Sequence, residues 1–155
     1  MHLPVPKLPA PGPTAVALCA VALLGLAASP AHAGDGTTVR FVIKDLDSTK
    51  GRVLCGLYAN EDKWLSPDYY MGVEGKPRSD GKAVCVFHDV PPGVYAISAF
   101  HDEDDDQEFD RGLFGIPKED YCASNDAYRR FGPPSWEDAI FRVGDKPVRM
   151  SAPVH

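Results

Sequence analysis

The clearest structural pattern in this chain lies in residues 83–100, which read AVCVFHDVPPGVYAISAF. Two runs rich in β-branched and aromatic residues, 83–88 and 94–100, flank the segment DVPPG. The two prolines lack a backbone N–H and resist a central strand, and the glycine allows the positive φ that many turns require. We therefore predict two antiparallel strands joined by this turn.

A second pair of strands precedes this one. Residues 37–43 and 51–58 are apolar or β-branched runs separated by a short polar turn, so they predict another hairpin. The polar stretch from residue 60 to residue 81 contains Pro and Gly and predicts a connection without strands.

The C-terminal part predicts one helix and a third pair of strands. Residues 124–132 begin with a serine that could cap a helix and end with a glycine that could stop it. Residues 139–143 and 147–150 read as strands around a Gly-Asp turn. Six or seven short strands with one short helix are typical of an all-β, antiparallel β-sandwich.

The N-terminal segment has the pattern of a secretory signal peptide. Lys7 is the only charged residue in the first 34, and an apolar core at 15–27 is followed by the sequence AHA. That core is too short to span a bilayer, which needs about 20 apolar residues. We predict a signal peptide at residues 1–33 and one β-sandwich domain at residues 34–155, located in the periplasm or secreted.

The predicted mature domain contains three cysteines, Cys55, Cys85 and Cys122. An exported protein is expected to form disulfides, and an odd number leaves one thiol over. We predict a Cys55–Cys85 disulfide because both residues lie within predicted strands, whereas Cys122 lies in a predicted loop.

An acidic run follows the second strand of the DVPPG pair. Residues 101–110 read HDEDDDQEFD, and seven of these ten side chains are carboxylates. Two carboxylates about 5 Å apart repel by roughly 3 kcal/mol at an effective dielectric near 20, so solvation or a cation must offset the charge. Acidic residues stand at the first, third, fifth and ninth places of a calcium-loop pattern, and a backbone carbonyl would serve at the seventh.

The run departs from an EF-hand at two positions. Gln107 stands at the sixth place, where glycine is usual, and Leu113 at the twelfth cannot bind a metal ion. Glu119 and Asp120 are candidates for the closing ligand. Because the donors are all oxygen atoms, we predict a calcium site. Its expected ligands are Asp102, Asp104, Asp106, Glu108 (through its carbonyl), Asp110 and Glu119. A solvated acidic loop without an ion is the alternative.

Two histidines occur in matching Phe-His-Asp triplets, His88 and His101. With Asp102 or Cys122 they could form a zinc or copper site. Polar caps at strand ends fit these histidines better, because no close ligand spacing is present.

The common catalytic motifs are absent from the sequence, among them the Gly-x-Ser-x-Gly elbow, His-Glu-x-x-His and the phosphate-binding glycine loop. A carboxylate-dependent hydrolase stays open as an alternative, since a glycosidase needs only two suitably placed acids. The chain has 16 Lys and Arg against 22 Asp and Glu. This balance argues against nucleic acid and anionic membranes. We expect a protein or glycan ligand, and no membrane insertion after signal cleavage.

Four motifs resemble those of an exported bacterial family known only as a domain of unknown function. They are FxDVPPGxYAI (87–97), FHDxDxD (100–106), GIPKExY (115–121) and SN (124–125), and the likeness continues through FGPPS to Phe141. In the family pattern the loop reads Asp-x-Asn-x-Asn-Gly. This chain has two further aspartates in place of the asparagines, and Gln107 in place of the glycine. The resemblance implies an immunoglobulin- or transthyretin-like sandwich and no particular activity.

Overall fold

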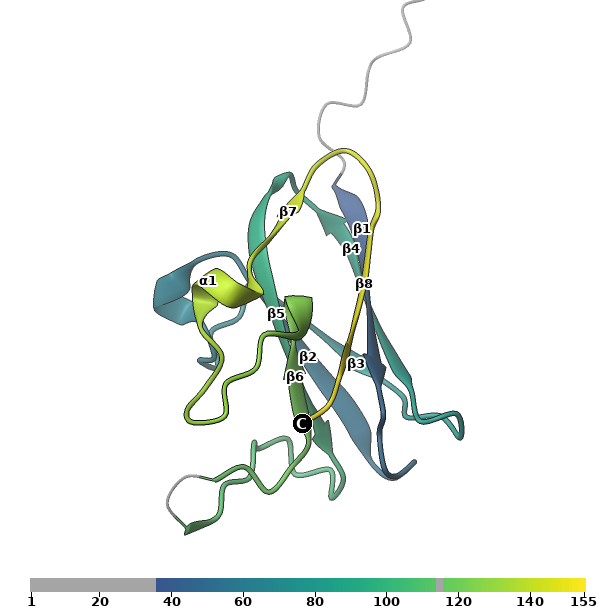
Figure 1. Cartoon of the computed structure of the whole chain (residues 1–155). Helices are drawn as coiled ribbons and strands as arrows, with labels where there is room; N and C mark the ends of the chain where they lie inside the picture. The colour runs from purple at the N-terminus through teal and green to yellow at the C-terminus, as the bar shows by residue number, and fades with distance from the viewer. Residues whose placement is uncertain (1–35, 114–115) are drawn as a thin grey trace, which may run out of the picture. The chain divides into compact units, whose positions relative to one another are not determined.

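The computed structural model describes residues 36–113 and 116–155, so the predicted signal peptide lies outside the described residues. The described chain forms two β-sheets with only short helical turns, and the expected all-β sandwich is confirmed (Figure 1). Among the described residues, no helix has the length and apolar character needed to span a membrane.

The smaller sheet has three strands in the order β4-β1-β8. Its central strand, β1 (Thr37–Lys44), pairs antiparallel with β4 (Ala83–Val90) and parallel with β8 (Val148–Pro153). Alternate residues of β1 are fully buried, as expected when one face of a strand covers a core. The β1–β8 pair departs from the antiparallel pairing expected throughout.

The larger sheet is built around β5 (Gly93–Asp102). Strand β2 (Arg52–Tyr58) pairs with one side of β5 and carries β3 (Met71–Gly75) at the sheet edge. Strands β6 (Tyr121–Ala123) and β7 (Phe141–Val143) pair with the other side. All of these pairs are antiparallel, so β5 has partners along nearly its whole length.

The three predicted hairpins are wrong in their pairing. The two strands of each predicted hairpin belong to different sheets: β4 and β5, β1 and β2, and β7 and β8. Each turn carries the chain across the sandwich. The sequence could not reveal this, because the same turn residues and alternation serve a hairpin and a crossing between packed sheets.

Two strands, β3 and β6, were not predicted. Strand β3 lies in the polar stretch expected to be a connection, and two of its five residues are glycines. A Cβ atom at Gly72 would overlap the ring of Tyr69, and one at Gly75 would crowd the carbonyl of Val84. Gly75 thus lets β3 lie close to β4, and the Tyr69 ring covers Gly72, whereas in the sequence both glycines resemble loop residues.

The helix predicted at residues 124–132 is wrong. Only a 3-10 turn, η3 (Ser124–Asp126), forms there, and Asn125 and Asp126 both have positive φ, which an α-helix excludes. The hydroxyl of Ser124 donates to the carbonyl of Ala139 (2.6 Å) and accepts from the amide of Ile97 (2.9 Å). Ser124 thus ties this turn to β5 instead of capping a helix.

The short helices lie elsewhere. Helix α1 (Trp136–Ala139) is capped at its N-terminus by Ser135, whose hydroxyl accepts a hydrogen bond from the amide of Asp138. A further 3-10 turn, η1 (Glu61–Lys63), is capped by the side chain of Asn60. The expectation of one short helix is therefore met by α1, at a different place in the chain.

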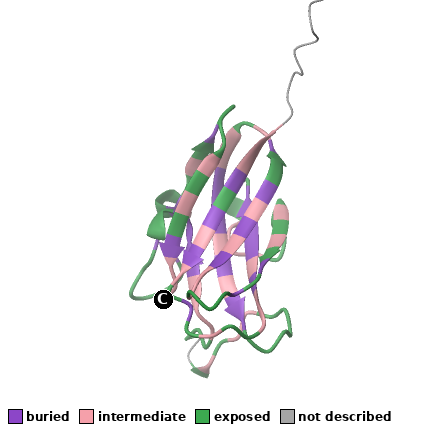
Figure 2. Cartoon of the chain, turned by 90° about the vertical axis from the view of Figure 1, so that its right-hand side faces the viewer, coloured by how far each residue is buried: buried purple, intermediate pink, exposed green. Residues whose placement is uncertain are grey.

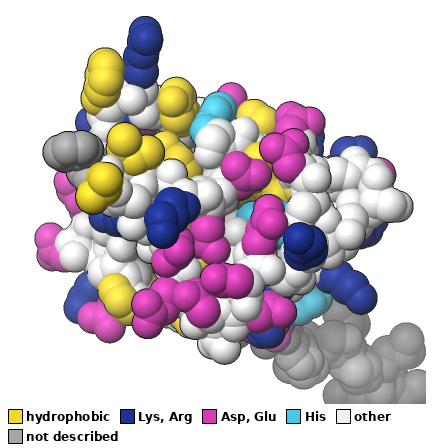
Figure 3. Space-filling model, turned by 90° about the horizontal axis from the view of Figure 1, so that it is seen from below, with side chains coloured by type: hydrophobic (Ala, Val, Ile, Leu, Met, Phe, Trp, Pro, Cys, Tyr) yellow, Lys and Arg dark blue, Asp and Glu magenta, His cyan; other side chains and the backbone are white. Residues whose placement is uncertain are grey.

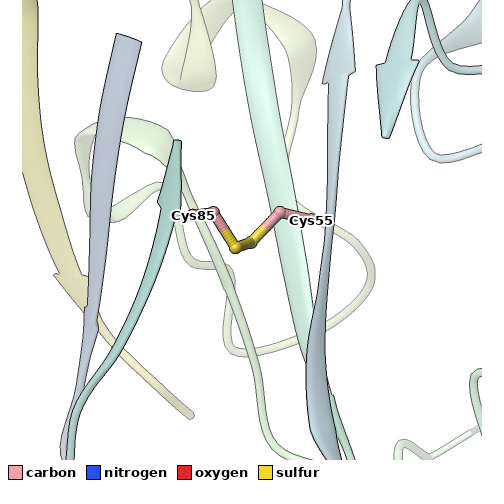
Figure 4. The surroundings of a disulfide bond; sticks show 2 residues. All are labelled: Cys55 and Cys85. Carbon is pink, nitrogen blue, oxygen red and sulfur yellow. A yellow bond between two sulfur atoms is a disulfide. The ribbon is translucent and has the colours of Figure 1, made fainter. Parts of the chain in front are cut away.

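The core lies between the two sheets, and a disulfide crosses it. Buried and less buried residues alternate along the strands (Figure 2). Cys55 of β2 faces Cys85 of β4 and is bonded to it, the pairing expected from the sequence (Figure 4). Cys122 is free, as expected, but it lies in β6 and not in a loop. Burial raises the pKa of its thiol.

Candidate metal centre

The acidic run lies at the lower end of the molecule in Figure 1, where β5 ends at Asp102. Figure 3 views this end and shows Asp and Glu side chains gathered over it, with few basic side chains among them. The chain returns to the sheet at β6. A pocket of about 330 Å³ opens here, lined by Asp47, Glu103, Asp104, Asp110, Lys118, Glu119 and Asp120.

Three of the predicted ligands, Asp102, Asp104 and Asp106, come together. One carboxylate oxygen of each lies within 4.8 Å of the other two. Asp102 is 0 % exposed, whereas the other two are exposed. The two oxygens of Asp102 accept the backbone amides of Asp106 (3.2 Å) and Gln107 (3.1 Å). These bonds curl the loop over Asp102 and bring the first, third and fifth places toward one point.

The sixth place of the loop has the conformation that glycine usually supplies. Gln107 has φ +65°, and Asp105 has φ +64°. A non-glycine residue in this region costs roughly 1–2 kcal/mol. The missing glycine therefore adds strain but leaves the tight turn in place.

Two contacts hold the loop against the sheet. Arg52 of β2 donates from Nε to Oδ1 of Asp105 (2.7 Å) and from Nη1 to Oε1 of Glu74 (3.2 Å). Gly51 has φ +57°, and a Cβ atom there would overlap the carbonyl oxygen of Asp102. The β1–β2 connection thus packs directly on the end of β5, and only glycine fits at this contact.

The carboxylates of two further predicted ligands, Asp110 and Glu119, lie outside the group of three. Asp110 and Glu119 line the same pocket, and Oε2 of Glu119 accepts the amide of Asp110 (3.1 Å). Glu108 is exposed. The three aspartates are thus placed for a shared ion, whereas the carboxylates of Asp110 and Glu119 would have to move toward them.

The pKa of Glu119 responds to the charges of the aspartates in the loop. Burial is the main cause that raises the pKa of Glu119, and the hydrogen bond from Asp110 opposes this rise. The negative charges of Asp102, Asp104 and Asp110 raise the pKa further. Its carboxylate therefore lies in the field of the clustered aspartates, which is where a closing ligand would stand.

His101 has an unsatisfied ring nitrogen, a feature that the sequence did not reveal. The side chain is 1 % exposed, and its Nε2 lies 2.9 Å from the carbonyl oxygen of Lys50. Because a carbonyl only accepts, Nε2 carries a proton. Nδ1 has no hydrogen-bond partner among the described residues, and Oε1 of Glu103 lies 3.8 Å from it.

The alternative site built from His88 and His101 is wrong. His88 is exposed near the end of β4, just before the turn into β5, whereas His101 lies eight residues beyond Gly93 in β5. His88 lies three residues before Pro91 and His101 nine residues after Pro92, so the two are offset by six residues, or roughly 20 Å at about 3.3 Å per residue. The matching sequence triplets therefore stand at opposite ends of the sandwich.

Comparison with known proteins identifies the family and no function. No curated protein and no solved structure matches the chain. The model of one family, DUF2141, matches residues 41–151, a span that begins in β1, ends in β8 and includes the acidic run. The chain therefore belongs to DUF2141, a family described as uncharacterized protein conserved in bacteria.

Proposed function

We propose that this protein is an exported β-sandwich module that binds a calcium ion at the end of β5. Asp102, Asp104 and Asp106 would supply side-chain oxygens, Glu108 its carbonyl, and Asp110 and Glu119 the closing ligands. The observation that carries the proposal is the buried carboxylate of Asp102, which lies beside two further aspartates. It forms no ion pair with any basic side chain in the described part of the chain.

A buried carboxylate is costly unless hydrogen bonds and an opposite charge compensate it. Two backbone amides supply part of this compensation to Asp102. Calcium binds oxygen at about 2.3–2.6 Å, so two ligands on opposite sides of one ion are roughly 5 Å apart. Three oxygens within 4.8 Å of one another can therefore share one ion without a large movement of the loop.

The ion would act as a staple. The segment between β5 and β6 has few buried side chains, and calcium would tie it to the end of the sheet. Calcium sites of extracellular modules bind with dissociation constants of about 10⁻⁴–10⁻³ M. An ion that binds only the folded state at 100 times its dissociation constant stabilises it by about 2.7 kcal/mol. A structural role therefore fits acids that converge on one point, whereas a hydrolase needs two acids placed apart.

Export is supported by two observations. The Cys55–Cys85 disulfide is of a kind that persists in oxidising compartments such as the periplasm. The N-terminal sequence has the charge and hydrophobicity pattern of a signal peptide. We propose that the mature module works in the periplasm or outside the cell, where it binds a protein or glycan and neither nucleic acid nor membrane.

Isothermal titration of the mature protein with calcium tests the proposal. We expect one calcium ion to bind the wild type, and Asp104→Ala to abolish this binding. Asp145→Ala is the matched control, because Asp145 is an exposed aspartate in the β7–β8 connection. A wild type that takes up no calcium, or an Asp104 variant that binds as well as the control, contradicts the proposal.

A further inference from the structure

The outer face of the smaller sheet is basic, although the chain as a whole is acidic. Figure 2 looks onto this face of strands β4, β1 and β8. The three strands contain a single acid, Asp89 near the end of β4, in a chain that has 22 Asp and Glu. Their Lys and Arg residues are Arg40 and Lys44 of β1 and Arg149 of β8, and we call these three residues the basic face.

The side chains of the basic face leave the sheet on its outer side. Arg40 is exposed, whereas its neighbours in β1, Val39 and Phe41, are 0 % exposed. Arg149 is likewise exposed in β8. Consecutive residues of a strand point to opposite faces, so both arginines point away from the core. Lys44 lies four residues beyond Arg40 in β1 and is therefore on the same side.

Two of these cations are neighbours across the sheet. Arg40 pairs directly with Arg149 in the parallel β1–β8 ladder. Neighbouring strands lie about 4.8 Å apart, and like charges placed directly opposite each other are destabilising. None of the three residues of the basic face forms an ion pair with a carboxylate in the described part of the chain. The fold therefore brings positive charges together here without supplying a countercharge.

Two further lysines extend the positive charge at the ends of the sheet. Lys146 lies two residues before β8, at the end where β1 begins, because β1 and β8 are parallel. Lys82 lies directly before β4, at the end where β1 finishes, because β1 and β4 are antiparallel. Lys82 has an exposed partner, with its Nζ 3.6 Å from Oδ2 of Asp80. Basic side chains therefore accompany β1 from one end to the other.

We propose that the basic face binds an acidic polysaccharide, a polymer whose sugar units carry carboxylates. The guanidinium group of an arginine matches a carboxylate through two parallel hydrogen bonds. Arg40 and Lys44 are about 13 Å apart along β1, at roughly 3.3 Å per residue. An extended polymer with repeated carboxylates can therefore meet the arginine pair and Lys44 at once, and each contact strengthens the next. This inference rests on the proposed location outside the cytoplasm and specifies the glycan expected there.

Other anionic partners fit this face less well. Protein interfaces are anchored by aromatic side chains, and no Phe, Tyr or Trp stands among the outward residues of the three strands. Binding to a membrane surface uses aromatic or long apolar side chains that enter the lipid. The apolar residues on this face are half-buried valines and a proline, which are too short for that role. Contacts through charge, repeated along a polymer, remain as the chemistry that the face offers.

Calorimetric titration of the mature protein with polygalacturonate, in EGTA and at low salt, tests the proposal. We expect binding that weakens as salt is added, because salt screens exposed charges. Arg40→Gln/Arg149→Gln should weaken binding by at least about 10-fold, which corresponds to about 1.4 kcal/mol and to the loss of two exposed ion pairs. Arg130→Gln/Arg142→Gln is the control, because it removes the same charge from two exposed arginines outside the smaller sheet, and it should bind as the wild type does.

The Arg40→Gln/Arg149→Gln variant should keep or raise the Tm, since the substitution removes two like charges that face each other. A loss of polymer binding in that variant is then not a loss of folding. If the variant does not fold, Lys44→Gln decides, and it too should weaken polygalacturonate binding.

Three results would overturn the proposal. The first is a wild type that does not bind polygalacturonate. The second is equal affinity of the two double variants, because the net charge and not this face would then govern binding. The third is tighter binding of polyglutamate or of phosphatidylglycerol vesicles than of polygalacturonate, as expected for a protein or a membrane partner. Because EGTA keeps calcium from the aspartate loop, these readouts do not depend on calcium binding, so the two proposals can fail separately.

Discussion

Asp104→Asn should change the stability of this protein in opposite directions with and without calcium. Asp104 is exposed, and its carboxylate lies within 4.8 Å of those of Asp102 and Asp106. At that distance two unit charges repel by about 0.9 kcal/mol in a water-like dielectric, which suits an exposed group. Removing the charge of Asp104 relieves two such pairs. In EGTA we therefore expect the variant to be more stable than the wild type by about 1–2 kcal/mol at low salt.

Calcium should reverse this order. At 100 times its dissociation constant, calcium stabilises the wild type by about 2.7 kcal/mol. If the loss of an anionic ligand weakens binding about 100-fold, the same calcium concentration stabilises the variant by only about 0.4 kcal/mol. The wild type then exceeds the variant by roughly 1 kcal/mol. The crossing is more diagnostic than either shift alone, because simple damage to folding lowers stability under both conditions.

Urea or thermal unfolding in EGTA and in calcium measures the crossing. For a domain of this size, 1 kcal/mol corresponds to a Tm change of about 4 °C. Asp145→Asn is the control and should behave as the wild type in both buffers. The reasoning is refuted if Asp104→Asn is less stable than the wild type in EGTA, or if calcium stabilises both proteins equally. Raising the salt concentration should shrink the gain in EGTA, since salt screens exposed charges.

Four further predictions follow from the core and the loop. The Cys55→Ala/Cys85→Ala double variant should lose about 3–4 kcal/mol of stability in urea unfolding, since the disulfide closes a loop with a sequence separation of 30; an unchanged midpoint contradicts this. Burial raises the pKa of Cys122, so iodoacetamide should label this thiol only after unfolding, and labelling of the folded protein at the unfolded rate would contradict its burial. The folded-state pKa of Glu119 is raised above the unperturbed value of about 4.3. The calcium-free protein should therefore lose stability as the pH rises from about 4.3 through the folded-state pKa of Glu119, and the calcium-induced rise in Tm should grow over the same pH range. Glu119→Gln should make both pH dependences flatter. Gly51→Ala should lower Tm and weaken calcium binding together, because a Cβ there collides with the end of β5, whereas Gly144→Ala, with open space around it, should not.

The sequence predicted where most strands lie, because that depends on local patterns, but it did not predict which strands pair. The strands around the DVPPG turn lie close to where the sequence placed them, because alternation and turn residues are local signals. Which sheet each strand joins depends on what packs against it. The parallel pairing of β1 with β8 joins segments more than 100 residues apart, and nothing in either segment specifies its partner.

In the candidate site, too, the sequence predicted the local grouping of residues but not the features that depend on distant residues. The spacing of Asp102, Asp104 and Asp106 brings their oxygens together because they stand in one turn, so the sequence predicted that grouping. The orphaned nitrogen of His101 depends on the carbonyl of Lys50, fifty-one residues away, and on the burial of the ring between the sheets. A histidine followed by an acid is common in sequences, and only the packing makes this one unusual.

The loop combines features that are each unfavourable without an ion. Asp105 and Gln107 have positive φ, three carboxylates meet within 4.8 Å, and one of them is buried. A chain with no use for this geometry could remove the cost with glycine at position 107 and asparagine at position 102, which keeps an acceptor for a backbone amide. The disulfide and the hydrophobic core are formed by residues outside the loop. The loop's strain and charge are therefore not needed to hold the sheets together, and the proposed calcium ion would offset both.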